Sequence, residues 1–189
     1  RIFASPQIKN QGTVVGNVVN ASPIADTIPF LVVSDALVEL QSATGVREVV
    51  LSKFYVGYKQ LDIRPDEIVT KIRIPVLAAN EKTRLYKVSM RKDLDISAVT
   101  FAARVVFEGK KMTKVALALG GVAATVVRLS GIEAEVVGKD FSEKIFHEGA
   151  LTLGQYIKPL SDLRASKEYR MLVAENYFKK FAREIGGEL

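Results

Sequence analysis

Apolar and polar positions alternate over residues 37–50, and this period of two predicts a β-hairpin that turns at residues 42–45. The same period returns over residues 64–75, after a turn that a proline begins. There we expect one strand with two faces, one carrying Ile68, Ile72 and Ile74 and the other carrying Val69, Lys71 and Arg73. Residues 51–59, between the two patterns, predict a short helix or loop.

A short helix is predicted before the hairpin, within residues 22–36. Asp26 or Thr27 can cap it, and Pro29 falls in its first turn, where proline is well tolerated. A polar stretch at residues 76–83 follows the last strand of this part. We interpret that stretch as the boundary between two modules, residues 1–78 and residues 82–189.

The second module begins with three strand patterns and continues with helix patterns. The strands are expected at residues 84–91, 97–109 and 112–121, with a hairpin turn at 108–111. The apolar faces of the last two strands are expected to consist of Val99, Phe101, Ala103, Val105 and Phe107, and of Val115, Leu117 and Leu119.

Two or three helices are expected after these strands, at residues 130–138, which is short, 142–157 and 166–185, with Ser142 as a possible N-cap of the second. The last should bury an apolar stripe made of Tyr169, Leu172, Val173, Tyr177, Phe178, Phe181 and Ile185. The fold class predicted from these patterns is α+β: a mixed sheet with short helices, then an antiparallel sheet covered by helices on one face.

The composition excludes several kinds of chemistry. The 189 residues include no cysteine and a single histidine, His147, so iron–sulfur ligation by thiolates, a cysteine nucleophile and a cysteine zinc site are impossible within the chain. His147 lies in a predicted helix, where a packing or surface role is favoured over a catalytic triad. We expect no metal site in this chain. No apolar run is long enough to span a membrane, and the absence of cysteine fits a reducing compartment, so we expect a cytoplasmic protein.

Basic residues give the chain a formal charge of +6, but they are spread along it in short clusters. Solvated surfaces and helix ends explain such a distribution better than a nucleic-acid interface does, since no stacking platform or known nucleic-acid motif accompanies it. The first residue is an arginine and not a methionine, and we expect the chain to be a processed chain or a fragment of a longer one.

The stretch QGTVVGNVVNASPIAD, residues 11–26, is the first candidate site. Its glycines permit close approach of a ligand to the backbone, and its Thr, Asn and Ser side chains offer short polar groups. The spacing matches neither a Rossmann fingerprint nor a P-loop. Taken alone, the stretch is interpreted as a turn more readily than as a binding site.

Two charged stretches are further candidates. Residues 86–97 place Lys87, Arg91, Lys92, Asp93 and Asp95 on a strand and the loop after it, as surface ion pairs or as a charged loop beside a ligand. Near the last helix, we expect a structural ion-pair network made of Asp162, Arg164, Glu168 and Arg170.

Six motifs in order give the chain a resemblance to one family. They are T-x-x-G-N-x-x-N-A-S-P-x-x-D, F-x-x-G-Y-K, P-x-E-I-V-x-x-I-x-I-P, K-x-x-x-R-x-x-x-D-I, L-x-L-G-G-V-A and P-L-S-D-x-R-A-S-x-E-Y-R. The chain resembles the flavoprotein portion of the xanthine dehydrogenase and carbon monoxide dehydrogenase family of molybdenum hydroxylases. The resemblance implies that residues 1–78 are the second half of an FAD-binding domain and residues 82–189 are the C-terminal α+β domain.

The resemblance also implies roles for individual residues. Thr13 and the backbone at Gly16 and Asn17 would contact the FAD pyrophosphate, and Asn20 belongs to the same stretch. Asp26 would bind ribityl or adenosine hydroxyls, Val69 would lie against the isoalloxazine and Lys87 would approach a polar atom of that ring. The loop of residues 88–96 would flank the flavin where nicotinamide docks. No residue of the chain is assigned as a catalytic acid, base or nucleophile.

By the same resemblance, the protein is an FAD-dependent oxidoreductase component. Electrons would pass from molybdopterin and iron–sulfur clusters, held on other segments or subunits, through FAD to NAD⁺. Sibling hydroxylases of carbon monoxide, nicotinate, quinoline or aromatic-CoA substrates use the same plan, and a non-catalytic scaffolding module is the alternative from another class. We expect an oligomer, and we expect the isolated chain to be inactive and a poor FAD binder because the first half of the domain is absent from it.

Overall fold

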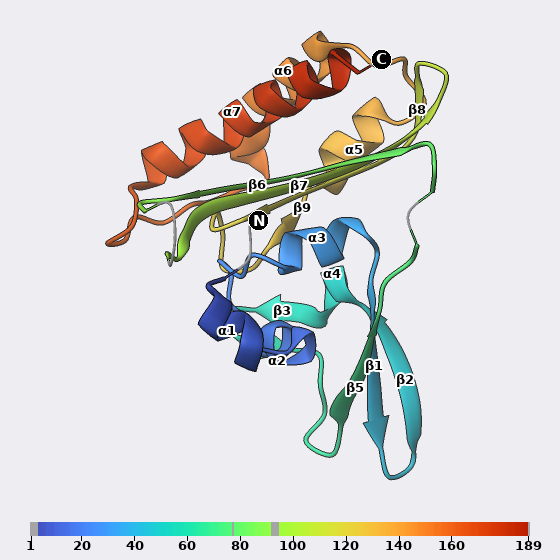
Figure 1. The fold of residues 1–189 in the computed structure, drawn as a ribbon, viewed down its shortest axis with the longest axis vertical. Coiled ribbons are helices and arrows are strands. Elements are labelled where there is room, and N and C mark those ends of the chain that lie inside the picture. The colour runs from blue at the N-terminus through green and yellow to red at the C-terminus, as the bar shows by residue number, and fades with distance from the viewer. Residues whose placement is uncertain (1–3, 77, 92–94, 189) are drawn as a thin grey trace.

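Figure 1 shows the computed structural model of the chain, which describes residues 4–76, 78–91 and 95–188. A four-stranded antiparallel sheet runs across the molecule, with the C-terminal helices on one side of it and the N-terminal elements on the other. A smaller three-stranded sheet projects away from this junction. We name residues 4–76 the first module and residues 81–188 the second module.

The first module consists of short elements. Their bounds are α1 (Pro6–Gln11), α2 (Val14–Val19), α3 (Ile28–Val33), β1 (Leu37–Ser42), β2 (Gly45–Val50), α4 (Leu51–Phe54), β3 (Tyr55–Gly57), β4 (Gln60–Leu61) and β5 (Ile68–Arg73). The hairpin predicted at residues 37–50 is confirmed, with Ser42 opposite Gly45 at its turn. The α+β class is confirmed as well, although the described sheet β2-β1-β5 is antiparallel throughout and not mixed.

The faces predicted for the strand now labelled β5 are wrong. Glu39 of β1 is opposite Lys71 while its neighbour Leu40 is opposite Val69, so Thr70 is an extra residue in a β-bulge. An extra residue reverses the alternation of faces along a strand. Val69 therefore shares the buried side with Ile72, and Ile68 is 65% exposed.

The second module has the predicted strands and helices in the predicted order, and two short elements, a strand and a 3₁₀ helix, were not predicted. The elements are β6 (Glu81–Ser89), β7 (Ser97–Glu108), β8 (Lys111–Gly120), β9 (Val127–Arg128), α5 (Ser130–Val136), α6 (Glu143–Leu151), a 3₁₀ helix η1 (Leu153–Gln155) and α7 (Lys167–Gly186). Ser142 caps α6 as expected, by accepting a bond from the Ile145 amide. The helix predicted to run to residue 157 ends at Leu151, and η1 follows it.

One face of the four-stranded sheet carries mostly large apolar side chains, and the other face carries several alanines. Phe101 and Leu117 face α5, α6 and α7 in one core, together with the other apolar residues predicted for that face. The opposite face presents Ala102, Ala116 and Ala118, and α3 of the first module packs on it in a second core. Small side chains let a helix approach a sheet closely, so the alanines determine how near the two modules lie.

The stripe predicted for α7 is partly wrong. Phe178, Phe181 and Ile185 are fully buried, but Tyr169 and Leu172 are 43% and 53% exposed. Arg170 takes the inward position near the start of the helix and is 2% exposed. Burial of an arginine requires hydrogen-bond partners, and the loop before α7 and the sheet supply them.

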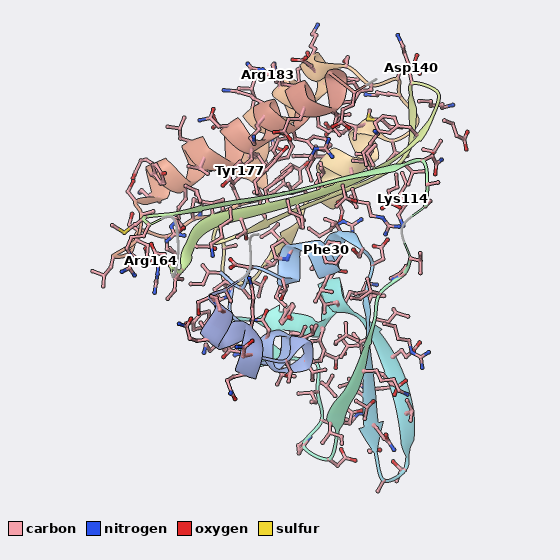
Figure 2. The ribbon with its side chains drawn as sticks, viewed as in Figure 1. Phe30, Lys114, Asp140, Arg164, Tyr177 and Arg183 are labelled. Carbon is pink, nitrogen blue, oxygen red and sulfur yellow. The ribbon has the colours of Figure 1, made fainter. Side chains whose placement is uncertain are left out.

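Charged side chains join the modules beside α3. Asp35, which follows α3 in a left-handed conformation (φ 53°), accepts bonds from Lys114 of β8 at 2.7 Å and from Arg128 of β9 at 3.0 Å. Arg128 also donates to the carbonyl of Val32 at 2.8 Å. Figure 2 labels Lys114 at this junction, where the chain of the first module approaches the edge of the larger sheet.

Two carboxylates of low exposure hold the smaller sheet together. Glu39 accepts bonds from Arg73 at 2.6 Å and from Thr70 at 2.7 Å, and the Arg73 guanidinium lowers the pKa of Glu39 to about 2. Glu67 accepts bonds from Arg47 at 2.7 and 2.9 Å, and the Arg47 guanidinium lowers the pKa of Glu67 to about 2. Hydrogen bonds to the ionised form are the cause in both cases.

The acid stability of the protein should reflect these carboxylates. The unfolded chain binds protons on them near their ordinary pKa of 4.5, whereas the folded chain keeps them ionised down to about 2. Their contribution to stability is therefore complete above about pH 4.5 and is lost as the pH falls toward 2. We expect Glu67→Gln to reduce the free energy of unfolding less at pH 3 than at pH 6, measured by urea titration; Glu135→Gln, at an exposed site on α5, is the control. An equal effect of Glu67→Gln at both pH values would contradict this assignment.

Gly121, directly after β8, should tolerate no side chain. Its φ is +80°, and a Cβ there would collide with the carbonyl oxygen of Ala98 and lie 3.1 Å from Arg170 Nη1. We expect Gly121→Ala to lower the free energy of unfolding by at least about 2 kcal/mol, from backbone strain and the collision together. Gly45→Ala, where no atom lies within 4 Å of the added carbon, should change it by less than about 0.5 kcal/mol in the same urea titration.

Candidate functional site

The first candidate stretch, residues 11–26, forms a short helix followed by a loop, so the interpretation of the whole stretch as a turn is wrong. Thr13 is the N-cap of α2, and its hydroxyl oxygen accepts a bond from the Gly16 amide at 2.9 Å. The Asn17 amide donates to the carbonyl of Thr13 at 3.0 Å. Asn20 is the C-cap, and residues 22–26 then run under the larger sheet toward α3. The cap explains the helix, because threonine satisfies an amide that the first turn leaves unpaired.

A cavity of about 410 Å³ opens between this stretch and the start of the second module. Its wall includes α1 and α2, the loop of residues 22–26, Lys87 of β6 and residues 95–97 before and at the start of β7. Four of the seven residues expected to bind a cofactor line it: Asn17, Asn20, Asp26 and Lys87. The fold therefore brings together residues that are up to 70 positions apart in the chain (17 to 87).

An ion pair occupies the polar end of the cavity. Lys87 Nζ lies 2.7 Å from Asp26 Oδ2, and these side chains are only 16% and 10% exposed. Lys87 also donates to the carbonyl of Asp95 at 3.1 Å. The Ser97 hydroxyl donates to the second carboxylate oxygen of Asp26. Charges shielded from water in this way interact strongly with a polar ligand that enters beside them.

The amide side chain of Asn17 is oriented by one contact. Its oxygen accepts a bond from the Thr27 hydroxyl, and within residues 4–76, 78–91 and 95–188 its nitrogen has no acceptor. Because the Thr27 hydroxyl holds the amide oxygen of Asn17, the NH₂ group of Asn17 is available to donate to a ligand in the cavity. Apolar side chains of Ile8, Ile24 and Ile96 complete the wall, which suits a ligand with both polar and apolar parts.

Three of the expected residues lie outside this cavity. Thr13 and Gly16 are in the first turn of α2, where the Gly16 amide is already paired with the Thr13 hydroxyl. Val69 lies on β5, half-buried against the core of the first module. Gly16 directly precedes the lining residue Asn17 and Thr13 lies four positions before it, whereas Val69 belongs to a strand that contacts α2.

Ser97 is a polar residue of the site that sequence reasoning did not assign. It is 1% exposed and lies next to the charged loop, but its partner Asp26 is 71 positions away in the chain. Nothing in the local pattern indicates that pairing. In the loop itself, the backbone amide of Arg91 donates to Asp95 at 2.8 Å and lowers the pKa of Asp95. Lys92 and Asp93 lie outside the described residues.

The network expected before α7 is present, with one change. Asp162 accepts bonds from Arg170 Nη2 at 2.7 Å and from the Arg164 amide at 2.8 Å. Glu168 does not join them and lies 3.8 Å from Lys167 Nζ instead. Arg170 also donates to the carbonyls of Ala98 and Gly121, the latter at 2.9 Å. The network therefore anchors α7 to the larger sheet.

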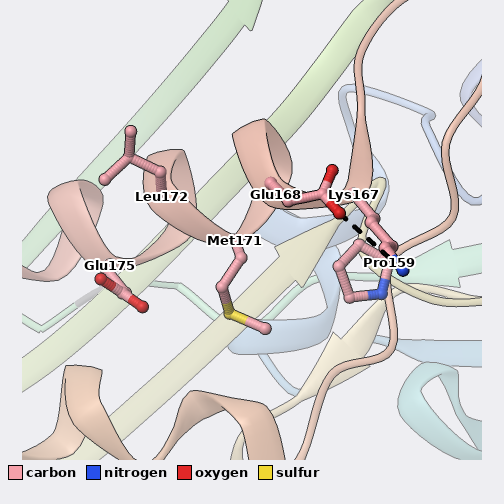
Figure 3. A pocket seen from close by; sticks show the side chains of 6 residues that line it. All are labelled: Pro159, Lys167, Glu168, Met171, Leu172 and Glu175. Carbon is pink, nitrogen blue, oxygen red and sulfur yellow. Dashed lines mark ion pairs between the residues drawn. The ribbon is translucent and has the colours of Figure 1, made fainter.

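A groove on α7 is a weaker candidate for a cofactor site. Figure 3 shows its lining, where Met171 and Leu172 lie between Glu168 and Glu175, with Pro159 at one end. It has a volume of about 430 Å³ and includes none of the expected site residues. The cavity at Asp26 and Lys87 is the stronger candidate because its polar groups converge from several elements.

Two searches of the described residues bear on other kinds of site. No group of three or more His, Cys, Asp or Glu side chains there is arranged to hold a metal ion. None of the described helices combines the length and the apolar character that crossing a bilayer requires.

Two family models together match nearly the whole chain. The FAD binding domain in molybdopterin dehydrogenase matches residues 1–77, and the CO dehydrogenase flavoprotein C-terminal domain matches residues 84–185. The chain is 32% identical to the xanthine dehydrogenase/oxidase of Gallus gallus over 185 residues, which cover 96% of this chain and 14% of that protein. It is 29% identical to the putative xanthine dehydrogenase FAD-binding subunit of Escherichia coli K12, over 99% of this chain and 66% of that subunit.

Solved structures show the same fold. Carbon monoxide dehydrogenase from Hydrogenophaga pseudoflava superposes with a TM-score of 0.90 at 26% identity, covering 95% of this chain and 62% of the matched chain. The chain thus spans less than two thirds of these relatives. The motifs, the fold and the two family models agree, and the chain belongs to the family of FAD-binding flavoprotein components of molybdenum hydroxylases, which includes xanthine and CO dehydrogenases.

Proposed function

We propose that this chain forms one wall of an FAD site in a molybdenum hydroxylase of the xanthine dehydrogenase type. The observation that carries the proposal is the Asp26–Lys87–Ser97 constellation, which joins the two modules at the cavity. Bound FAD would supply two-electron redox chemistry, and the protein groups around it would tune that chemistry. We propose residues 1–78 and 82–189 as the units that contribute to the wall.

The donor set of the cavity fits a flavin dinucleotide. The Asp26 carboxylate would accept bonds from ribityl or adenosine hydroxyls, and Lys87 would lie near a polar ring atom, where its charge favours a negatively charged ring. Asn17 and Asn20 would bind polar groups of the phosphate and sugar region. We propose Thr13 and Gly16 as further contacts of the pyrophosphate and Val69 as a contact of the ring. All three lie outside the cavity, and the Gly16 amide would have to exchange the Thr13 hydroxyl for a phosphate oxygen. A dinucleotide needs further walls, and we expect them from the part of the relatives that this chain does not span.

The ion pair has to rearrange when such a ligand enters. Asp26 Oδ2 is occupied by Lys87 and Oδ1 by Ser97. A ligand hydroxyl that donates to Asp26 can share an oxygen with either, since each carboxylate oxygen has two acceptor positions. Lys87 has three donors, of which Asp26 and the Asp95 carbonyl use two. One donor of Lys87 is therefore left for a ligand.

The finer parts of the proposal concern electron flow. We propose that electrons reach FAD from molybdopterin and iron–sulfur clusters on other segments or subunits, because this chain has no cysteine to ligate a cluster. NAD⁺ is the proposed acceptor, docking beside the loop of residues 88–96.

Relatives include a glyceraldehyde dehydrogenase medium chain and a nicotinate hydroxylase, so a sibling hydroxylase is an alternative of the same class. A scaffolding module in such an assembly is the non-catalytic alternative, and it predicts no flavin binding. We also propose that the protein is oligomeric and cytoplasmic.

Substitutions in the ion pair should weaken FAD binding. In the flavoprotein with its complete FAD domain, we expect Asp26→Asn and Lys87→Met each to raise the FAD dissociation constant by about tenfold or more, through loss of a charge-assisted hydrogen bond. Quenching of flavin fluorescence measures the constant. Lys82→Met removes a lysine from the same strand that pairs with Glu188, away from the cavity, and should leave binding unchanged. Equal affinities in all three variants would remove the cavity from the proposed site.

Lys87 should also affect the flavin potential. Loss of its positive charge disfavours the reduced, negatively charged ring. We expect Lys87→Met to lower the two-electron midpoint potential of bound FAD by roughly 30 mV, which corresponds to a tenfold change in the equilibrium constant of reduction. Spectroelectrochemical titration measures this shift, and Lys82→Met is again the matched control. A potential that does not move would place Lys87 away from the ring.

A further inference from the structure

The first half of α7 carries apolar side chains that the fold of this chain leaves uncovered. Tyr169 and Leu172 belong to the apolar stripe predicted for the helix, yet they are exposed, whereas Phe178 and Phe181 further along it are fully buried. Arg170 takes the inward position near the start of α7 and donates to carbonyls of the larger sheet. The core therefore covers the later part of the stripe and leaves its first part facing outward.

A groove of about 430 Å³ lies along the same part of α7. In Figure 3 the side chains of Met171 and Leu172 extend from the helix between those of Glu168 and Glu175. Positions 168, 171, 172 and 175 have the i, i+3, i+4 and i+7 spacing of one helix face. Pro159, from the segment before the helix, borders the groove at one end. The groove is thus an apolar strip on one face of a long helix.

Two carboxylates flank this apolar strip. Glu168 precedes Leu172 by four positions and Glu175 follows it by three, so both are its neighbours on the helix surface. Within the described residues, Glu175 has no ion pair. Glu168 lies 3.8 Å from Lys167 Nζ, and both of these side chains are more than 60% exposed, so the pair is weak. The groove is therefore acidic on balance, on a chain whose formal charge is +6.

The shape and the charge of the groove indicate which kind of partner fits it. Apolar residues at helical spacing beside a groove bind the apolar face of a second helix, because the side chains of the two helices interdigitate. Carboxylates on both sides of the apolar strip attract basic side chains on both sides of the apolar residues of that partner. An amphipathic helix with Leu or Met bordered by Lys or Arg satisfies both conditions.

A second copy of this chain does not satisfy them through the same strip. If two copies of α7 paired about a two-fold axis at Met171 and Leu172, each copy would place its glutamates opposite glutamates of the other copy. This holds for a parallel and for an antiparallel pair, since Glu168 and Glu175 lie on either side of the axis in both. Like charges that face one another disfavour such a contact.

We propose that the groove on α7 is a docking site for a basic amphipathic helix of a partner protein. The apolar residues of that helix contact Pro159, Met171 and Leu172, and its lysines or arginines bind Glu168 and Glu175. The proposal does not rest on the flavin site, and the linings of the groove and of the cavity at Asp26 and Lys87 have no residue in common.

The first test uses two synthetic peptides with capped ends as probes, LKKLLKLLKKLLKL and LEELLELLEELLEL. They have the same helical pattern of leucines and opposite charges. Fluorescence anisotropy of each labelled peptide is measured against the full-length flavoprotein at low salt. We expect the basic peptide to bind one-to-one with a dissociation constant of about 100 μM or lower and the acidic peptide not to bind.

Substitutions in the groove should reverse this preference. We expect Glu168→Lys with Glu175→Lys to weaken binding of the basic peptide by about tenfold or more and to allow the acidic peptide to bind. Glu168→Gln with Glu175→Gln should weaken the first without allowing the second. Leu172→Ser should weaken the basic peptide by about threefold or more, through loss of apolar contact. Glu108→Lys with Glu135→Lys, at exposed sites away from the groove, makes the same change in charge and should alter binding by less than about twofold.

The second test identifies the natural occupant. A photo-reactive amino acid replaces Leu172 in the flavoprotein of the native host, and the cross-linked peptide is sequenced by mass spectrometry. We expect a segment of another protein with Lys or Arg beside Leu or Met at helical spacing. A cross-link to a second copy of this chain, to a segment without that pattern, or to nothing overturns the proposal. So does equal binding of both peptides, no binding of the basic one, or an equal loss in the control variant. FAD binding enters none of these outcomes, so failure of the flavin site would leave them unchanged.

Discussion

The packing of α3 on the alanine face of the larger sheet is the contact on which the rest of the structure depends. Ala102 and Ala118 are opposite one another in register and, with Ala116, are fully buried beneath α3. A larger side chain at any of these positions would push the helix away, because protein interiors leave no free volume for it. The helix follows the loop of residues 22–26 directly, so its distance from the sheet also determines where Asp26 lies relative to Lys87.

Charge pairs make this contact specific. When a helix packs on small side chains, the contact fixes the distance between helix and sheet, but it fixes less well where the helix lies along the sheet. Asp35 at the end of α3 binds Lys114 and Arg128 of the sheet, and Asp26 before α3 binds Lys87 and Ser97. Partly buried ion pairs of this kind contribute less to stability than to the choice of one arrangement over others. Both groups lie between the two modules, and the one at Asp26 also lines the cavity.

The second module was predicted well from its sequence, for a physical reason. The core residues of β7 and β8 recur with a period of two from Val99 to Phe107 and from Val115 to Leu119, and a long hairpin has few alternative registers that keep them on one face. The first module was predicted less accurately. Its elements are six residues or shorter, so a single bulge at Thr70 reverses a face and a single cap at Thr13 converts an expected turn into a helix.

The sequence by itself determined the class of the fold, the order of the main strands and helices of the second module, the absence of thiolate chemistry and, through six ordered motifs, the family resemblance. The resemblance also predicted seven FAD-binding residues, of which Asn17, Asn20, Asp26 and Lys87 line one cavity. The tertiary structure alone decided that Ser97 completes the Asp26 pair and that Arg170 is buried at the start of α7. These features depend on contacts between segments tens of residues apart, and local periodicity carries no information about such contacts.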